Sequence, residues 1–109
     1  MNLGSDLFRT TGGAEALPAL CRRYHVRRLD VFGSAATGQG YDPARSDLDL
    51  LVSFDNLPPA AYAEAYFGLQ AALEALAGRK VDLVTEAGLR NPHFRRRVDA
   101  ERRALFQAP

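Results

Sequence analysis

The stretch Val31–Phe54 has the sequence VFGSAATGQGYDPARSDLDLLVSF and decides most of what the chain can be predicted to do. It begins as an apolar strand that stops at Gly33-Ser34, continues through small and polar residues, and ends as a run of strand-forming residues. Successive side chains of a strand point to opposite faces, so Asp47 and Asp49 should project on the same side of the second strand.

Asp47 and Asp49 form a predicted metal-binding pair. Two neighbouring carboxylates repel each other unless a cation lies between them. Oxygen ligands suit a hard ion such as Mg²⁺, which proteins usually hold with one or two carboxylates and substrate phosphates. Backbone N–H groups at the Gly33-Ser34 turn, which leads into a short predicted helix, can supply contacts to those phosphates. Together these features predict chemistry on a nucleoside triphosphate.

The two motifs, in this order, are similar to those of a known family. Gly33-Ser34, the small residues up to Gly38, and the segment Ser46–Leu50 closely resemble the core motif of the DNA polymerase β-like nucleotidyltransferases. That motif is a Gly-Ser turn followed, after a short helix and a loop, by a Ser-Asp-x-Asp strand. Because 109 residues leave no room for a large second domain, the chain most resembles the minimal nucleotidyltransferases, many of which are antitoxins paired with HEPN-domain toxins. The resemblance covers about residues 26–106.

The resemblance implies the residues of the site. Asp82, on the next predicted strand, would complete a triad with Asp47 and Asp49, and all three are expected to be catalytic residues and metal ligands. Such a triad can hold two Mg²⁺ ions about 4 Å apart, and Asp82 could also act as general base. The three carboxyl groups should then converge beside Ser34. The nucleotide-binding residues implied are Gly33, Ser34 and Ser46.

A purely structural interpretation of the same residues stays open. In that case Asp47 caps a strand, Asp49 pairs with an arginine, Asp82 faces solvent and Ser34 caps the short helix that follows it. A carboxylate among the apolar residues of these strands would be costly without a partner, which favours the metal site.

The function that the resemblance implies is Mg²⁺-dependent nucleotidyl transfer from ATP to a hydroxyl group. The acceptor would be a tyrosine of a cognate HEPN ribonuclease toxin, which AMPylation silences and with which the chain could form a hetero-oligomer. Many family members carry an arginine in the turn, where Ala35 and Thr37 stand here. This departure keeps open an antitoxin that works by binding alone. A third hypothesis is the catalytic subunit of a small-molecule (aminoglycoside-like) or tRNA nucleotidyltransferase.

The composition predicts one small globular domain over residues 1–109, with 1–13 as loop or poorly ordered chain and the core within about 14–107. A net charge of +1 gives no general attraction to nucleic acid, and no stretch is apolar enough to cross a membrane. The single cysteine, Cys21, excludes an intramolecular disulfide and suits the cytoplasm. We expect Cys21 to be a small core residue.

Hydrophobic periodicity predicts an α/β (α+β) fold, a small mixed β-sheet with helices packed on it. Strands are expected at residues 27–32, 47–54 and 80–85, and helices at about 17–25, 35–37, 60–77 and from 91 onward. The last helix should bury Phe94, Val98, Leu105 and Phe106. On the long helix, Tyr62 is expected on the inward stripe and Phe67 as a partly buried flank residue, with a partner contact as the alternative. The C-terminal arginines are expected to form mainly a solvated face; they are Arg90, Arg95, Arg96, Arg97, Arg102 and Arg103.

Overall fold

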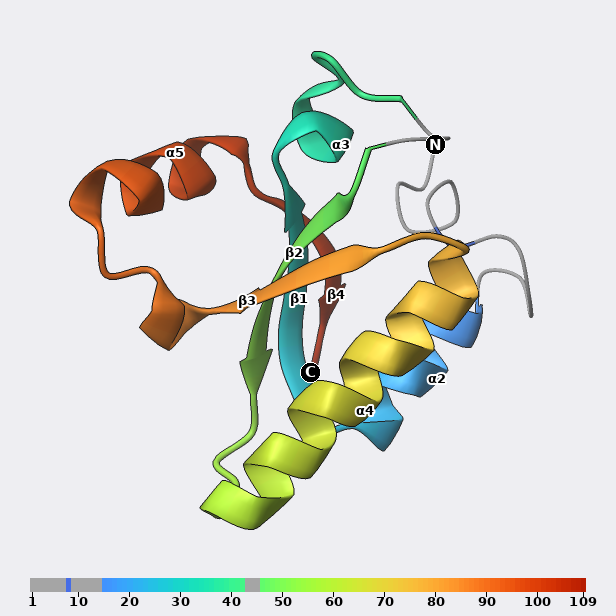
Figure 1. Cartoon of the computed structure of the whole chain (residues 1–109). Coiled ribbons are helices and arrows are strands. Elements are labelled where there is room, and N and C mark those ends of the chain that lie inside the picture. The colour runs from blue at the N-terminus through green and yellow to red at the C-terminus, as the bar shows by residue number, and fades with distance from the viewer. Residues whose placement is uncertain (1–7, 9–14, 43–45) are drawn as a thin grey trace.

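The computed structural model describes residues 8, 15–42 and 46–109, and in this part of the chain it shows a four-stranded mixed sheet with helices on both faces (Figure 1). The strand order is β3-β2-β1-β4. Strand β1 pairs antiparallel with both β2 and β4, whereas β2 and β3 are parallel. The strands are β1 (Val26–Phe32), β2 (Leu48–Phe54), β3 (Val81–Thr85) and β4 (Arg103–Gln107). The predicted small mixed sheet is confirmed.

Helices α2 (Ala16–Arg23) and α4 (Pro59–Ala77) cover one face of the sheet, and α5 (Pro92–Glu101) lies on the other (Figure 1). The short helix α3 (Ser34–Thr37) follows β1 directly, and a 3₁₀ turn, η2 (Glu86–Gly88), follows β3. Local chemistry sets these boundaries. Proline at the first position starts α4, and Gly78 ends it with φ of 70°. The Asn91 side chain accepts hydrogen bonds from two N–H groups of the first turn of α5.

The sheet separates two apolar cores, because side chains alternate between the faces of each strand. The larger core lies beneath α2 and α4 and includes Leu29, Val31, Leu50, Leu69 and Leu73. The smaller core lies beneath α5 and consists of Phe32, Leu51, Leu89 and Val98, with Val84 and Phe94 packed against it. The alternation therefore puts acidic residues of β1, β2 and β3 on the α5 face. They are Asp30, Asp49 and Asp82.

The fourth strand corrects the prediction of a helix that continues to Phe106. Helix α5 ends at Glu101, and residues 103–107 pair with β1 as the edge strand β4. The apolar positions Phe94 and Val98 are one helical turn apart, but the next turn would have brought Glu101 and Arg102 into the core. The backbone of Arg102 is extended, with ψ of 138°, and the chain then covers the hydrogen-bonding edge of β1. Leu105 and Phe106 pack partly buried against the larger core from this strand.

The outer side of α4 also differs from the prediction. Phe67 is 66% exposed and Tyr62 is 37% exposed, so neither the flank position of Phe67 nor the inward position of Tyr62 is correct. Tyr66 turns instead toward the free edge of β3, where its hydroxyl donates to the carbonyl of Leu83. The Gln70 amide donates to the Val81 carbonyl on the same edge at 3.3 Å. Phe67 stays largely exposed beside Tyr66, at the border between α4 and β3.

Three further expectations concern the core and the ends of the chain. Cys21 is fully buried, and burial raises the pKa of its thiol from 9.0 to about 12, which confirms a core role. The predicted N-terminal loop over residues 1–13 lies outside the described residues, except for Phe8, which is buried in the larger core. Within the described ranges, no helix is both long and apolar enough to span a membrane.

Candidate functional site

The Gly33 turn lies at the end of β1, and two independent features require glycine there. Its backbone has φ of 70° and ψ of −153°, a region that residues with a side chain rarely adopt. A Cβ atom built at Gly33 would also lie 2.4 Å from Oδ2 of Asp49. The Gly33 carbonyl accepts hydrogen bonds from the N–H groups of Ala36 and Thr37, which closes the predicted turn. The glycine turn and the Asp49 carboxylate are therefore in direct proximity.

The acidic residues of β2 and β3 are brought together by the strand register. Asp49 lies opposite Phe32 of β1 on one side and opposite Asp82 of β3 on the other. Asp47 directly precedes β2, two residues before Asp49 and therefore on the same side. Asp49 is half-buried, whereas Asp47 and Asp82 are exposed. Asp82 does face solvent, as the structural interpretation expects, but it does so beside Asp49.

The electrostatics of this group match its geometry. Burial raises the pKa of Asp49 above its ordinary value of 3.8, and the charges of Asp82 and Asp47 raise the pKa further. The charge of Glu101 acts in the same direction, whereas that of Arg97 lowers the pKa. A carboxylate that is desolvated and surrounded by other acids is stabilised by a bound cation. The site therefore favours an added positive charge next to Asp49.

The donor set fits a hard divalent ion, although the site is not preformed. Among the described residues, no group of three His, Cys, Asp or Glu side chains is arranged so that it could hold a metal ion as it stands. The expected close convergence of three carboxyl groups is therefore not seen, although Asp49 and Asp82 are paired in the strand register. Carboxylate oxygens are the ligand type that Mg²⁺ takes, and substrate phosphates usually complete its shell.

The structure adds two residues that the sequence patterns did not indicate. Glu101, the last residue of α5, accepts a hydrogen bond from the backbone N–H of Gly33 at 3.1 Å. Arg97, one helical turn earlier, has its Nε 3.9 Å from the same carboxylate oxygen. The i, i+4 spacing of Arg97 and Glu101 was visible in the sequence. Their approach to Gly33 was not, because it depends on how α5 packs on the sheet.

The two predicted serines occupy different surroundings. Ser34 is half-buried and begins α3, directly after Gly33, and the helix has no side-chain cap, so the capping alternative for Ser34 is wrong. The Ser46 hydroxyl accepts a hydrogen bond from the Asp42 N–H at 3.0 Å, and the Ser46 N–H donates to the Asp42 carbonyl at 2.8 Å. Ser46 is therefore hydrogen-bonded to Asp42 just before β2 begins, and its expected contact with nucleotide stays a prediction.

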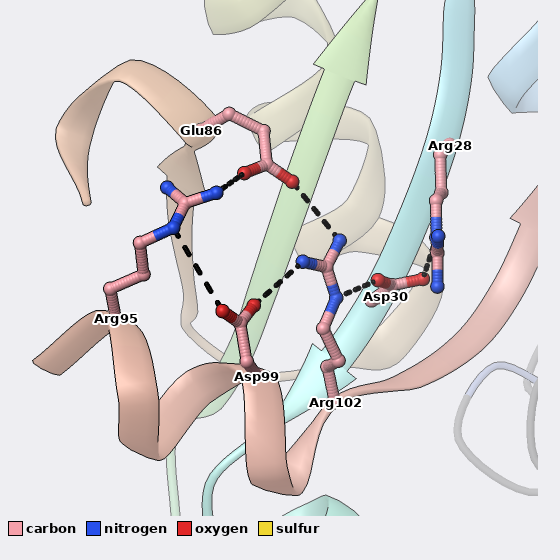
Figure 2. Close-up of polar contacts among 6 residues, drawn as sticks. All are labelled: Arg28, Asp30, Glu86, Arg95, Asp99 and Arg102. Carbon is pink, nitrogen blue, oxygen red and sulfur yellow. Dashed lines mark hydrogen bonds and ion pairs between the residues drawn. The ribbon is translucent and has the colours of Figure 1, made fainter.

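An ion-pair network around the buried Asp30 fixes the end of α5 against the sheet (Figure 2). Asp30 is fully buried, and its carboxylate accepts from Arg102 Nε at 2.6 Å and from Arg28 Nε at 2.9 Å. Arg102 also donates to Asp99 at 3.1 Å and to Glu86 at 3.0 Å. Arg102 is only 16% exposed, unlike the solvated arginines expected in this segment. Because Arg102 follows Glu101 directly, the network also positions Glu101 beside Gly33.

One family model matches most of the chain, including the residues of this site. The model described as a nucleotidyltransferase domain matches residues 14–105. The chain belongs to the nucleotidyltransferase domain family. This match includes the Gly33 turn and the three acidic residues Asp47, Asp49 and Asp82.

Individual relatives of this nucleotidyltransferase agree with the family model. The protein adenylyltransferase MntA of Thermococcus cleftensis is 38% identical over 72 residues, which are 66% of this chain and 68% of that protein. A solved structure of a candidate minimal nucleotidyltransferase is 38% identical, with a TM-score of 0.68 over 94% of this chain and 95% of that one. The fold is therefore that of a minimal nucleotidyltransferase.

One toxin–antitoxin structure is a more distant neighbour of this nucleotidyltransferase. It contains a tri-AMPylated HEPN toxin of Shewanella oneidensis in complex with an MNT antitoxin. The matched chain has a TM-score of 0.56 and 19% identity, and the match covers 87% of this chain and 70% of that chain. At this identity the similarity concerns the fold alone.

Proposed function

We propose that this chain is a Mg²⁺-dependent protein adenylyltransferase that moves AMP from ATP to a tyrosine hydroxyl of a cognate HEPN-type toxin and so acts as an antitoxin. The observation that carries the proposal is the contact between the Gly33 turn and the Asp49 carboxylate, with Asp82 in register beside it. The protein adenylyltransferase MntA, 38% identical, supports the reaction class. The single buried Cys21 suits a cytoplasmic location.

Each residue of the site has a role in this reaction. Asp47, Asp49 and Asp82 would hold the metal, which supplies charge neutralisation of the triphosphate and activation of the attacking oxygen. Gly33 allows the triphosphate to approach the backbone closely, with Ser34 beside it. The acceptor hydroxyl forms a bond to the α-phosphorus, the bond from the α-phosphorus to the bridging oxygen breaks, and pyrophosphate leaves. The exposed Asp82 carboxylate takes the proton of the acceptor hydroxyl.

The surface next to Asp82 supports a protein acceptor. An open groove of about 690 Å³ lies between α4 and β3 and is lined by Tyr62, Ala63, Tyr66, Phe67, Leu83 and Val84, together with residues of the turn after β3. The charge of Asp82 contributes to the raised pKa of Tyr66, after burial, so this groove and the acidic site are neighbours. Exposed aromatic side chains are typical of protein interfaces. This arrangement favours an acceptor residue delivered by a folded partner.

Mass spectrometry of the partner tests the proposal. A purified HEPN-type toxin that binds this chain would be incubated with the full chain, ATP and Mg²⁺. The proposal expects a mass increase of one or more adenylyl groups on tyrosine, lost when Asp47 and Asp49 are both changed to Ala. A toxin that binds the chain but gains no mass under these conditions would overturn the enzymatic proposal.

Neutralisation by binding alone is the second candidate. It is supported by the uncharged turn, where Ala35 and Thr37 provide no cation. The variant Asp47→Ala with Asp49→Ala separates the two functions in cells that express the toxin. Binding alone expects full protection from toxin by this variant, whereas adenylyl transfer expects none.

A further inference from the structure

The pair Arg97 and Glu101 lies directly on the glycine turn. One oxygen of Glu101 accepts from the Gly33 N–H at 3.1 Å and also lies 3.9 Å from Arg97 Nε. An anionic oxygen thus already occupies the hydrogen-bonding position that a phosphate oxygen of a nucleotide would take at this N–H. Glu101 is 24% exposed and Arg97 is 61% exposed, so the arginine has room to change its direction.

A triphosphate that enters the site adds negative charge to a site that is already acidic. The acidic residues Asp47, Asp49 and Asp82 repel the phosphates unless cations intervene. The turn itself contributes only Ala35, Ala36 and Thr37 after Ser34, none of which is charged. Arg97 is close enough for its charge to act on Asp49, and its guanidinium could donate two parallel hydrogen bonds to phosphate oxygens.

We propose that Arg97 binds the polyphosphate of the nucleotide, and that Glu101 holds both Arg97 and the Gly33 N–H until the phosphates displace its carboxylate. This inference rests on the proposed nucleotide chemistry of the site and extends it to two residues of α5. In the absence of nucleotide, Glu101 satisfies the N–H of Gly33 and partly neutralises Arg97. When nucleotide binds, phosphate oxygens take over both contacts, and the Glu101 side chain turns away.

The packing of α5 allows this exchange without a movement of the helix. The end of α5 is fixed by the buried contact of Arg102 with Asp30 at 2.6 Å. The Arg97 guanidinium lies 5.4 Å from the ring centroid of Phe94, which itself packs edge-on against Phe32. Only the two side chains need to rearrange, over a backbone that the network holds in place.

Nucleotide binding by the full chain, measured by titration calorimetry with Mg²⁺, tests the proposal. The probes are the non-hydrolysable ATP analogue AMP-PNP and AMP, which lacks the β- and γ-phosphates. Arg97→Ala should weaken AMP-PNP binding about tenfold to hundredfold, the usual effect of losing charge-assisted hydrogen bonds, and should change AMP binding much less. Arg97→Lys should restore part of the affinity, because lysine keeps the charge without the planar fork.

Two further variants complete the design. Arg96→Ala removes the same charge from the neighbouring, exposed position of α5 and should change AMP-PNP binding only slightly. Glu101→Gln keeps an oxygen that can accept from Gly33 but removes the competing charge, so AMP-PNP should bind several-fold more tightly. The melting temperature of each nucleotide-free variant reports whether its fold is kept.

The outcomes separate this inference from the proposed function. If wild type binds AMP-PNP but Arg97→Ala and Arg96→Ala lose affinity equally, Arg97 does not contact the phosphates. The same conclusion follows if Arg97→Ala weakens AMP and AMP-PNP alike. If Glu101→Gln binds AMP-PNP more weakly than wild type, Glu101 is not a competitor of the nucleotide. If wild type itself does not bind AMP-PNP, the proposed function fails together with the inference.

Discussion

Replacement of Gly33 by alanine perturbs the glycine turn and the Asp49 carboxylate together. The backbone at Gly33, with φ of 70° and ψ of −153°, would cost a residue with a side chain about 1–3 kcal/mol. The new Cβ would lie 2.4 Å from Asp49 Oδ2 and 3.3 Å from its Cγ, so the carboxylate must move. Overpacking of this kind typically costs about 1–3 kcal/mol more. We therefore expect Gly33→Ala to lower the free energy of unfolding by about 2–6 kcal/mol.

A double-mutant cycle isolates the part of this cost that comes from Asp49. In Asp49→Ala the nearest remaining atom is Cβ, 3.5 Å from the position of the new methyl group, so the overlap disappears. Urea unfolding of wild type, both single variants and the double variant, in EDTA, gives the coupling energy. We expect the double variant to be more stable than additivity predicts by about 1–3 kcal/mol. Additivity within about 0.5 kcal/mol would refute the reasoning that Gly33 and Asp49 touch.

Three other perturbations have defined outcomes. The pKa of Asp49 is raised above 3.8, so its ionised form destabilises the fold at neutral pH but not below pH 3.8, where the carboxyl group is protonated. In EDTA, Asp49→Asn should therefore raise the melting temperature at pH 7 and not below pH 3.8. An equal gain under both conditions would exclude charge as the cause. Arg102→Met leaves the buried Asp30 with Arg28 as its remaining ion-pair partner and should lower the free energy of unfolding by about 3 kcal/mol in urea titrations. The control Arg103→Met, at an exposed position, should change the free energy of unfolding little, and equal losses in the two variants would contradict the role of the network. Phe67→Ser should change stability by less than about 0.5 kcal/mol but weaken binding to the toxin in calorimetry, and unchanged binding would separate Phe67 from the interface.

Local patterns in the sequence predicted much of the fold and of the acidic site. The alternation of Asp47 and Asp49 on a strand, and the break of β1 at Gly33, depend on neighbouring residues alone and are present in the structure. The family resemblance implied that Asp82 lies on the strand next to Asp49, and the strand register confirms this position. The pairing of β2 and β3 is parallel. The roles of these residues in metal binding and catalysis stay predictions.

The parts that sequence patterns did not predict depend on long-range contacts. The apolar residues Leu105 and Phe106 predict a longer helix, but residues 103–107 pair with β1 as a strand. The hydrogen bond of Arg102 to Asp30 also fixes the chain where the helix ends. The sequence pattern does not predict the ion pairs of Asp30, because a single acidic residue in an apolar strand does not indicate which residue will pair with it. Glu101 and Gly33 are 68 residues apart in the chain, and only the packing of α5 brings them together.

The central claim is that Asp47, Asp49 and Asp82 bind a metal ion together with the nucleotide. Thermal unfolding in the presence of ATP tests this claim most directly, because the measurement does not require the acceptor protein. The wild-type chain would be melted with ATP and Mg²⁺ and, in parallel, with ATP and EDTA. At a hundredfold excess of ligand over Kd, binding adds about 2.7 kcal/mol, which raises the melting temperature by on the order of 10 °C. We expect this rise in wild type with Mg²⁺ only, and its loss in Asp49→Asn. An equal rise with Mg²⁺ and with EDTA would contradict the claim that these carboxylates bind the metal.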